Sequence, residues 1–250
     1  MPLAGTLDLT DRVRTAPQMP NTDAEPWEIE GVELLHVSYE IDDRHMTSVL
    51  PPALHPTIPP TVYFSVARYP DSPVGAFMLA QVRAGCRAAT LPRGFLLRAY
   101  TDSPRAAEAL AANWGYNCDI ADVRLNRRYE RIEGIVRVDG REVLNVALLN
   151  PEPISGGDIQ YVANMNLARL PDDNGRGALI QVDPEYRFHR ADRGRPQIVA
   201  FDREAWHARD VDPVDPIVAS CVVCDTGFPR IRYVLDPTVP AMAGTRKVGG

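Results

Sequence analysis

Short apolar stretches separated by turn residues dominate the chain, and they predict strands. The run 61–69 (TVYFSVARY) combines β-branched and aromatic residues and is followed by the turn sequence PDSP, a combination typical of strands. Asp139-Gly140 separates two further runs and predicts a two-residue hairpin turn. The predicted strands are 32–39, 61–69, 75–83, 93–101, 128–137, 142–149, 159–170, 178–189, 196–201, 217–224 and 231–235.

One clear helix is predicted directly after residue 102. Ser103 can cap its first turn, and Pro104 suits the first helical position. An apolar face follows, and Gly115 marks the end of the helix. A second, short helix is expected over 203–208. The pattern predicts an α+β fold that is mostly antiparallel β, with one main helix.

The proline-rich segment 1–26 is interpreted as an N-terminal arm, and the segment 238–250 as a flexible tail, so that a single domain spans 27–237. Apolar residues make up 45% and charged residues 24%, which is typical of a soluble globular protein. No run is long enough to cross a bilayer, and the N-terminus lacks the pattern of a signal peptide. We therefore expect a cytoplasmic protein without a membrane partner. A formal charge of −6 argues against nucleic acid as a partner.

The basic residues are almost all arginine, because the 27 lysines and arginines include a single lysine, Lys247, near the C-terminus. Lysine-dependent phosphate loops, pyridoxal phosphate sites and Schiff-base nucleophiles are excluded unless the tail folds back into a pocket. Cys221 and Cys224 have CxxC spacing, but they lie in an apolar run without a second ligand pair and are interpreted as core cysteines. The five histidines show no metal-binding spacing and are interpreted as surface or core residues. No metal and no cofactor is expected.

Four passages carry a resemblance to a known family. They are 49–54 (VLPPAL), 69–77 (YPDSPVGAF), 100–116 with its alanine-rich helix, and 215–235, which contains DPIVAS and FPRIRYVL. In their order and spacing, from about residue 30 to residue 236, they resemble the acetoacetate decarboxylase family. The resemblance implies a β-barrel or cone with one main helix and an internal pocket, and assembly into a homo-oligomer.

The resemblance also shows where this chain departs from the family. The family sequence aromatic-Pro-Lys-Lys follows the helix, and its first lysine forms a Schiff base with a keto acid. Here the segment reads Tyr116-Asn117-Cys118-Asp119, so that Cys118 takes the place of the nucleophilic lysine. A thiol that adds to a ketone gives a thiohemiketal, which has no cationic nitrogen to accept electrons. Cys118 is therefore interpreted either as a pocket-lining thiol or as a nucleophile, and Asp119 is expected to raise its pKa.

Further positions that the resemblance assigns to the pocket also differ. Ser65 and Leu79 correspond to two glutamates of the family, and the family arginine near the start of the domain has no counterpart between residues 14 and 44. The predicted substrate-binding residues are Ser65, Leu79, Trp114, Asn117 and Cys118. Core packing is the alternative role of Trp114. The pocket is predicted to keep its position while its chemistry changes.

Non-covalent chemistry is still possible with the residues present. Asp119 in an apolar pocket is a candidate general acid or base, and Tyr116 can donate a hydrogen bond to an enolate oxygen, as can Asn117. Arg98 is a charge within an apolar run and is a candidate for binding a carboxylate or enolate. The alternatives are a solvated loop carboxylate for Asp119 and an ordinary ion pair for Arg98. The predicted catalytic residues are thus Asp119, Tyr116 and Arg98.

Three functions fit these observations. The first is a divergent enzyme that acts on a small or polyketide-like carbonyl compound by acid–base chemistry, in a cyclisation, dehydration, aldol reaction or isomerisation, in secondary metabolism. The second is a non-catalytic protein that binds a small molecule on the same fold. The third is a decarboxylase that does not depend on lysine.

Overall fold

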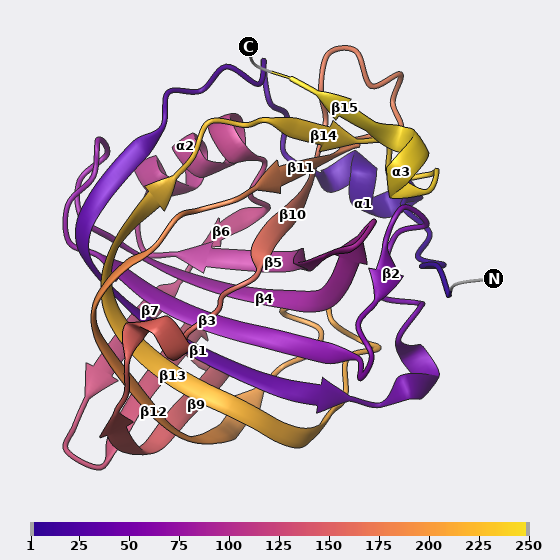
Figure 1. Ribbon diagram of the computed structural model, residues 1–250. Helices are drawn as coiled ribbons and strands as arrows, with labels where there is room; N and C mark the ends of the chain where they lie inside the picture. Colours follow the sequence, from indigo (N-terminus) through magenta and orange to yellow (C-terminus); the bar gives the residue numbers. More distant parts are fainter. Residues whose placement is uncertain (1–2, 249–250) are drawn as a thin grey trace.

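The computed structural model describes residues 3–248 (Figure 1). Within them the backbone forms one 15-stranded sheet, and no helix there has the length and apolar character needed to cross a bilayer. The strands are β1 (Trp27–Ile41), β2 (His55–Pro56), β3 (Thr61–Tyr69), β4 (Phe77–Ala88), β5 (Leu91–Thr101), β6 (Cys118–Ile120), β7 (Asp122–Arg127), β8 (Arg131–Val138), β9 (Arg141–Pro153), β10 (Ala163–Ala168), β11 (Ala178–Val182), β12 (Arg187–Phe201), β13 (Pro213–Phe228), β14 (Tyr233–Leu235) and β15 (Thr245–Lys247). The helical elements are α1 (Thr10–Thr15), η1 (Asp43–His45), α2 (Pro104–Trp114), η2 (Gly156–Asp158) and α3 (Ala241–Gly244).

The sheet runs in the order β15-β14-β11-β10-β5-β4-β3-β1-β13-β12-β9-β8-β7, with β2 beside β4 and β6 beside β5. Only the pairs β5–β10 and β5–β6 are parallel among the described strands. The sheet is strongly curved but open, as Figure 1 shows. The mostly antiparallel α+β fold with one main helix is therefore confirmed.

The central strands β1, β3, β4 and β5 are buried on both faces. On one face they pack against β7, β8 and β9, and residues such as Leu35, Val66 and Val146 form a large apolar core. The opposite face packs against α2 and β11, with Trp114 and Phe228 among its apolar residues. Because successive residues of a strand point to opposite faces, each central strand contributes to both layers.

Local signals predicted α2 and the β8–β9 hairpin correctly. The Ser103 hydroxyl accepts a hydrogen bond from the Ala106 amide, Pro104 is the first helical residue, and Gly115 ends the helix with a φ of 67°. Asp139 and Gly140 both have positive φ and join β8 to β9. Cys221 and Cys224 are buried in β13, as predicted for core cysteines.

Two predicted elements are wrong. The strand expected over 178–189 is divided, because β11 ends at Val182 and Pro184 lies in the segment before β12 begins. A proline has no amide hydrogen to donate to the sheet, so it interrupts strand pairing. The short helix expected over 203–208 is a series of turns, in which His207 adopts a φ of 53° that an α-helix does not allow.

Both segments predicted to flank the domain contact it. Val13 of α1 and Met19 are buried, although they lie in the segment 1–26 predicted as an arm. In the predicted tail, α3 is followed by β15, which pairs with β14 at the edge of the sheet. Residues 1–2 and 249–250 of these two segments lie outside the described residues.

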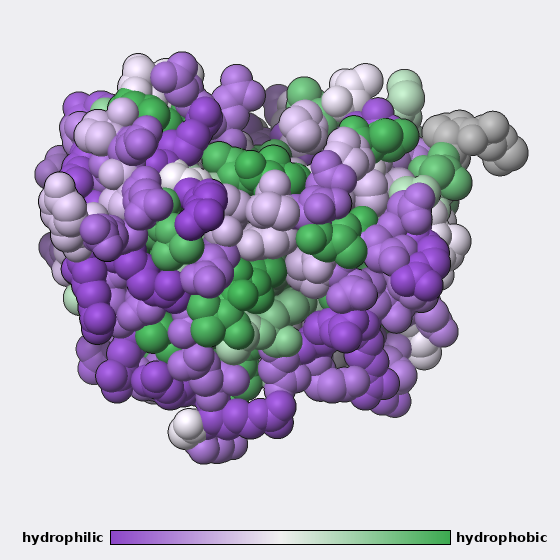
Figure 2. All heavy atoms as spheres, turned by 90° about the horizontal axis from the view of Figure 1, so that it is seen from below, coloured by the Kyte–Doolittle hydropathy of each residue, from purple (hydrophilic) through white to green (hydrophobic). Residues whose placement is uncertain are grey.

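The face of the molecule seen from below in Figure 2 has apolar atoms near its centre and polar atoms around them. The strands at the bottom of Figure 1 include β12 and β13, which carry the exposed side chains of Val199, Val214 and Ile217. These side chains are about half exposed.

Candidate active site

A row of residues crosses the central strands on the face opposite the large core. His36 of β1 pairs with Ser65 of β3, and Ser65 pairs with Gln81 of β4. Gln81 pairs with Ala99 of β5, which in turn pairs with Cys118 of β6. Because residues paired across neighbouring strands share a face, the row brings together positions that are far apart in the sequence.

The first half of this row borders an inner cavity of about 30 Å³. Its polar and titratable lining residues are His36, Ser65, Tyr69, Gln81, Arg83, Tyr116, Tyr161, Asn164, Tyr186 and Thr226. Such a volume accommodates about two water molecules. It is therefore large enough for one small polar group, such as a carboxylate, and a molecule of the size of pyruvate requires the lining side chains to move apart.

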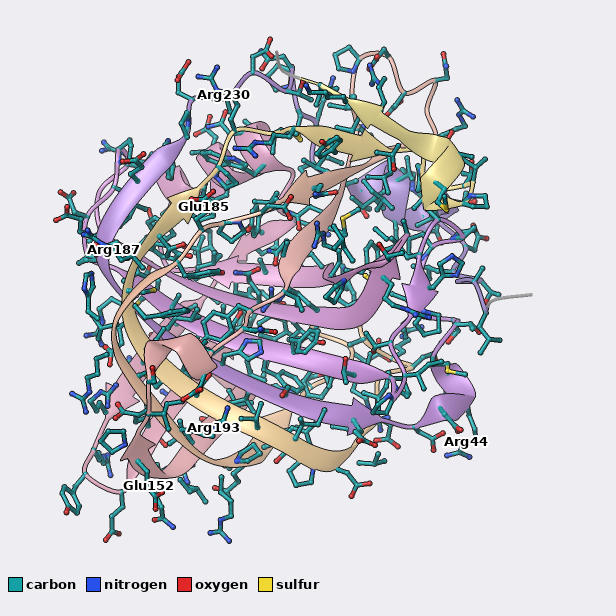
Figure 3. All side chains as sticks on the ribbon, in the orientation of Figure 1. Arg44, Glu152, Glu185, Arg187, Arg193 and Arg230 are labelled. Carbon is teal, nitrogen blue, oxygen red and sulfur yellow. The ribbon has the colours of Figure 1, made fainter. Side chains whose placement is uncertain are left out.

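A larger groove of about 1270 Å³ adjoins the cavity. The two share five lining residues, Pro184, Tyr186, Thr226, Gly227 and Phe228, so the groove lies directly beside the cavity. Figure 3 labels Glu185, Arg187 and Arg230, three of the charged residues that line the groove. The shape suits a ligand whose small polar head enters the cavity while the remainder lies in the groove.

Arg83 is the charged residue of the cavity. Its side chain is 5% exposed and forms no ion pair with an acidic residue in the described part of the chain. One guanidinium nitrogen, Nη1, donates to the Val162 carbonyl at 3.1 Å and to the Asn164 side-chain oxygen at 2.6 Å, whereas Nε has no partner. Burying a charge without a counter-charge is costly. Arg83 therefore makes the cavity a candidate site for an anionic group.

The contacts of Asn164 fix the direction of the neighbouring hydrogen bonds. A guanidinium can only donate, so the oxygen of the Asn164 amide must face Arg83. The Asn164 NH₂ group then donates to Gln81 Oε1 at 2.7 Å and to the Tyr116 hydroxyl at 2.9 Å. Gln81 and Tyr116 act as acceptors in these bonds, which leaves the NH₂ group of Gln81 and the hydroxyl hydrogen of Tyr116 as donors. The side chain of Asn166 is a second hydrogen-bonding neighbour of the Tyr116 hydroxyl.

Burial keeps the tyrosines of the cavity neutral. It raises the pKa of Tyr186 to about 12 and raises the pKa of Tyr116 still further, because the phenolate would be desolvated. Both hydroxyls therefore carry their hydrogen near neutral pH. With Arg83, Gln81 and Ser65 they form a cluster of donors, which is the arrangement that stabilises an oxyanion.

His36 also lines this cavity and is the one histidine among its described lining residues. Its ring stacks on Tyr63 at 5.5 Å between centroids and lies 4.9 Å from the ring of Tyr161, and Nδ1 has no hydrogen-bond partner in the described chain. Burial, and then the positive charge of Arg83, lower the pKa of His36 to about 3. The ring is therefore neutral near pH 7.

Five of the eight predicted site residues fall in three places. Ser65 and Tyr116 line the cavity, and the Ser65 hydroxyl is buried without a partner. Leu79 and Trp114 are fully buried in the apolar layer beside it, where the Trp114 indole nitrogen donates to the Pro229 carbonyl at 2.7 Å. Asn117 lines a different, small cavity of about 20 Å³ with Arg12 and His207. Of these five residues, only Ser65 and Tyr116 line the cavity.

Cys118 faces the same side of the sheet as Gln81 but lies at the far end of the row. Its side chain packs against the apolar layer that contains Trp114. Burial raises the pKa of the thiol, and the negative charge of Asp119 raises it further, in the direction predicted from the sequence. The thiol therefore carries its hydrogen near neutral pH, which lowers its nucleophilicity.

Asp119 and Arg98 form a second cluster outside the cavity. The Arg98 guanidinium contacts both Asp119 Oδ2 and His207 Nε2, and it lies 5.2 Å from the centre of the Tyr100 ring. Burial and the nearby Arg98 lower the pKa of His207 to about 4. The ion pair matches the structural alternative considered for Arg98, and Asp119 is half exposed within it.

Sequence reasoning did not identify Arg83, Asn164 or His36. A signal for Arg83 was present, because Gln81 and Arg83 alternate with apolar residues in a strand that is otherwise apolar (FMLAQVRAG). The same argument that selected Arg98 applies to Arg83. Asn164 and His36 carried no comparable signal, because only the register of the sheet brings β10 and β1 to the same cavity.

Lys247 does not reach this site. It lies exposed on β15, where it pairs with Tyr233 of β14 at the edge of the sheet. No lysine therefore lines the cavity in the described structure, and the cationic group there is a guanidinium.

A family model described as acetoacetate decarboxylase matches residues 13–232. The match spans most of the chain, so the protein belongs to the acetoacetate decarboxylase family, as the sequence resemblance predicted. No curated protein sequence matches this chain significantly.

Solved structures of the family share the fold. An acetoacetate decarboxylase is similar with a TM-score of 0.73 at 17% identity, covering 83% of this chain and 88% of that one. For the acetoacetate decarboxylase of Legionella pneumophila the TM-score is 0.72 at 18% identity, with 92% and 96% covered. The enduracididine biosynthesis enzyme MppR, complexed with the condensation product of pyruvate and imidazole 4-carboxaldehyde, gives 0.67 at 16% identity, with 93% and 96% covered. The fold thus occurs in acetoacetate decarboxylases and also in MppR, an enzyme of enduracididine biosynthesis.

Proposed function

We propose that this protein is a lyase- or isomerase-type enzyme that binds a carbonyl compound with an anionic group, without forming a covalent bond to it. Arg83 binds the anionic group, and the donors of Gln81 and Tyr116 bind the carbonyl oxygen. Negative charge that develops on this oxygen during proton transfer is stabilised by the same donors. Next to a carbonyl group, dehydration, aldol chemistry, isomerisation and cyclisation can all proceed through such an enolate.

The observation that carries this proposal is the buried guanidinium of Arg83, which has no acidic partner in the described chain. If an acidic side chain formed an ion pair with Arg83, the charge of the guanidinium would already be neutralised, and an anionic ligand would gain little by binding to it. Since the inner neighbours of Arg83 are a carbonyl and an amide oxygen, its charge is available to a ligand. A carboxylate is the anion that matches a guanidinium best in geometry.

The relatives support the type of ligand. The enzyme MppR has been crystallised with pyruvate, which is a small carbonyl compound with a carboxylate. The groove of this chain extends the site well beyond the size of pyruvate. We therefore propose a substrate that is larger than pyruvate, of which a polyketide-like compound from secondary metabolism is one example.

Binding of pyruvate by calorimetry tests the anion site, with Asn164→Asp as the decisive variant. The new carboxylate would form an ion pair with Arg83 and compete with the ligand, while the size of the side chain stays the same. We expect the Kd for pyruvate to rise at least about tenfold, which corresponds to about 1.4 kcal/mol. Asn174→Asp adds the same charge at an exposed position and is the matched control. Equal affinity of Asn164→Asp and the wild type would refute the anion site.

Treatment with borohydride in the presence of pyruvate tests the non-covalent mechanism. We expect no reduced adduct on the folded domain, because the single lysine is exposed on β15. An adduct at Lys247 that requires the intact fold would contradict the proposal. Release of carbon dioxide from a β-keto acid without an adduct would instead favour the lysine-independent decarboxylase.

The alternative of a non-catalytic binding protein uses the same donors. It predicts that pyruvate binds and that Asn164→Asp weakens binding, but that no proton of the ligand exchanges with solvent. The proton-exchange experiment described below therefore separates the two functions. Assembly into a homo-oligomer is a further part of the proposal, and light scattering coupled to size-exclusion chromatography measures it.

A further inference from the structure

His36 differs from the other lining residues of the cavity in its acid–base chemistry. The tyrosines hold their hydrogens tightly, the guanidinium of Arg83 cannot act as a base, and no aspartate or glutamate lines this cavity in the described chain. The neutral imidazole of His36 has a nitrogen with a free lone pair. A reaction next to a carbonyl needs such a group to accept a proton from carbon.

The position of His36 fits this role. Its partner across the strands is Ser65, and the next residue in the row is Gln81, whose NH₂ group is free to donate. The imidazole ring is held between Tyr63 and Tyr161, and Nδ1 is buried without a hydrogen-bond partner in the described chain. An imidazole that packing holds beside a cluster of oxyanion donors has a defined orientation toward a bound ligand.

We infer that His36 is the catalytic residue that removes and returns the proton on the carbon next to the substrate carbonyl, and that it does so when an anionic group is bound to Arg83. This inference rests on the proposed function, because it requires an anionic carbonyl ligand in the cavity.

The requirement for the anion follows from the charges around His36. The titratable or charged side chains that face it are Arg83 from β4, Tyr63 and Tyr69 from β3, and Tyr116, Tyr161 and Tyr186 from other segments. Burial is the larger cause that disfavours a protonated imidazole, and the charge of the Arg83 guanidinium is the second. A bound carboxylate offsets that charge, so that the base becomes stronger when the substrate is present.

The proton transfer can be written for pyruvate. A methyl C–H bond breaks, and its proton bonds to a ring nitrogen of His36. The C–H electron pair forms the carbon–carbon double bond of the enolate, and the carbonyl π pair moves onto the oxygen held by Gln81 and Tyr116. The reverse step returns a proton from the imidazolium to the same carbon. In a substrate with a β-hydroxyl group, the imidazolium can instead protonate the hydroxyl as it leaves as water.

Exchange of the methyl hydrogens of pyruvate for deuterium, followed by ¹H NMR in D₂O, tests this inference without the natural substrate. The wild type is expected to accelerate the exchange, and His36→Gln is expected to slow it about 100-fold at equal occupancy of the site, within the range of general acid–base catalysis. The Kd for pyruvate is expected to change less than threefold. His45→Gln removes an exposed histidine and is the matched control, with exchange equal to the wild type.

The pH dependence separates proton transfer from a loss of structure. In the wild type the exchange rate of the bound ligand should fall at low pH as His36 becomes protonated, and this decrease should be missing from the residual rate of His36→Gln. The variant His36→Asn and the urea midpoints of all variants show whether the fold is retained.

The outcomes of the exchange experiment distinguish the role of His36 from the presence of the anion site. Exchange by folded His36→Gln or His36→Asn within threefold of the wild type, at equal occupancy, would overturn the role of His36 and leave the anion site intact. The same holds if the wild type binds pyruvate but does not accelerate exchange. Failure of the wild type to bind pyruvate would overturn the proposed function and, with it, this inference.

Discussion

The buried, neutral His36 makes the stability of the protein depend on pH in a way that can be calculated. The pKa of His36 is about 3 in the folded protein, compared with an ordinary value of 6.5 in the unfolded chain. Between these values the unfolded chain binds a proton that the folded protein does not bind. Lowering the pH through this range therefore favours unfolding, and the stability due to the neutral ring is fully present only above about pH 6.5.

The expected size of the effect follows from the two pKa values. Each pH unit below 6.5 changes the free energy of unfolding by about 1.4 kcal/mol. From pH 7 to pH 5 the contribution of His36 is then a loss of about 2 kcal/mol. His36→Gln has no titrating group at this position. The variant should therefore lose about 2 kcal/mol less than the wild type over the same interval.

Urea unfolding at pH 5, 6 and 7, at constant ionic strength, measures the difference. His207 also has a lowered pKa, of about 4, but it is present in both proteins and its contribution cancels in the comparison. His45→Gln is again the control and should keep the slope of the wild type. If the wild type and His36→Gln differ by the same free energy at all three pH values, His36 is not a buried neutral group and the reasoning is refuted.

Two further predictions concern residues that support the scaffold. Ser103→Ala removes the hydroxyl that accepts a hydrogen bond from the Ala106 amide at 3.3 Å, and it should lower the free energy of unfolding by about 1 kcal/mol. Urea unfolding measures this change, with Ser103→Thr as the conservative control. An unchanged midpoint for Ser103→Ala would contradict the prediction. Asp192→Asn removes a carboxylate that is 2% exposed and lies 2.9 Å from Arg127; because Arg127 keeps Glu33 as a partner at 3.0 Å, a loss of about 2 kcal/mol is expected. A stability within about 0.5 kcal/mol of the wild type would show that the Asp192–Arg127 pair is dispensable.

Features set by neighbouring residues in the sequence could be predicted. The cap at Ser103, the Asp139-Gly140 turn and the strand 61–69 depend on local conformational preferences, and all three are present in the structure. The short helix expected over 203–208 also rested on local preference, but there His207 adopts a positive φ and the backbone forms turns. Local preference is weak in a segment of this length, because a single helical turn gains few hydrogen bonds.

The site was only partly predictable because the sheet register decides which side chains meet. The resemblance identified Ser65 and Tyr116, which do line the cavity. It did not identify Arg83 or Asn164, since these residues lie on β4 and β10, far apart in the sequence, and are joined by a hydrogen bond of 2.6 Å. The acid–base role expected for Asp119 is still a prediction, and in the structure this residue pairs with Arg98 outside the cavity.

The cation of the cavity is a guanidinium and not a lysine, which also bears on the type of reaction. A Schiff base accepts electrons on nitrogen, and the bond formed to the substrate prepares it for the loss of carbon dioxide. Arg83 forms no such bond, and when it binds a carboxylate it stabilises the ionised group that decarboxylation must convert to neutral carbon dioxide. Interactions that are stronger in the ground state than in the transition state slow a reaction. In the proposed reaction, a carboxylate bound to Arg83 is therefore protected, and the enolate forms at the neighbouring carbonyl, where Gln81 and Tyr116 can donate to the oxygen that gains charge.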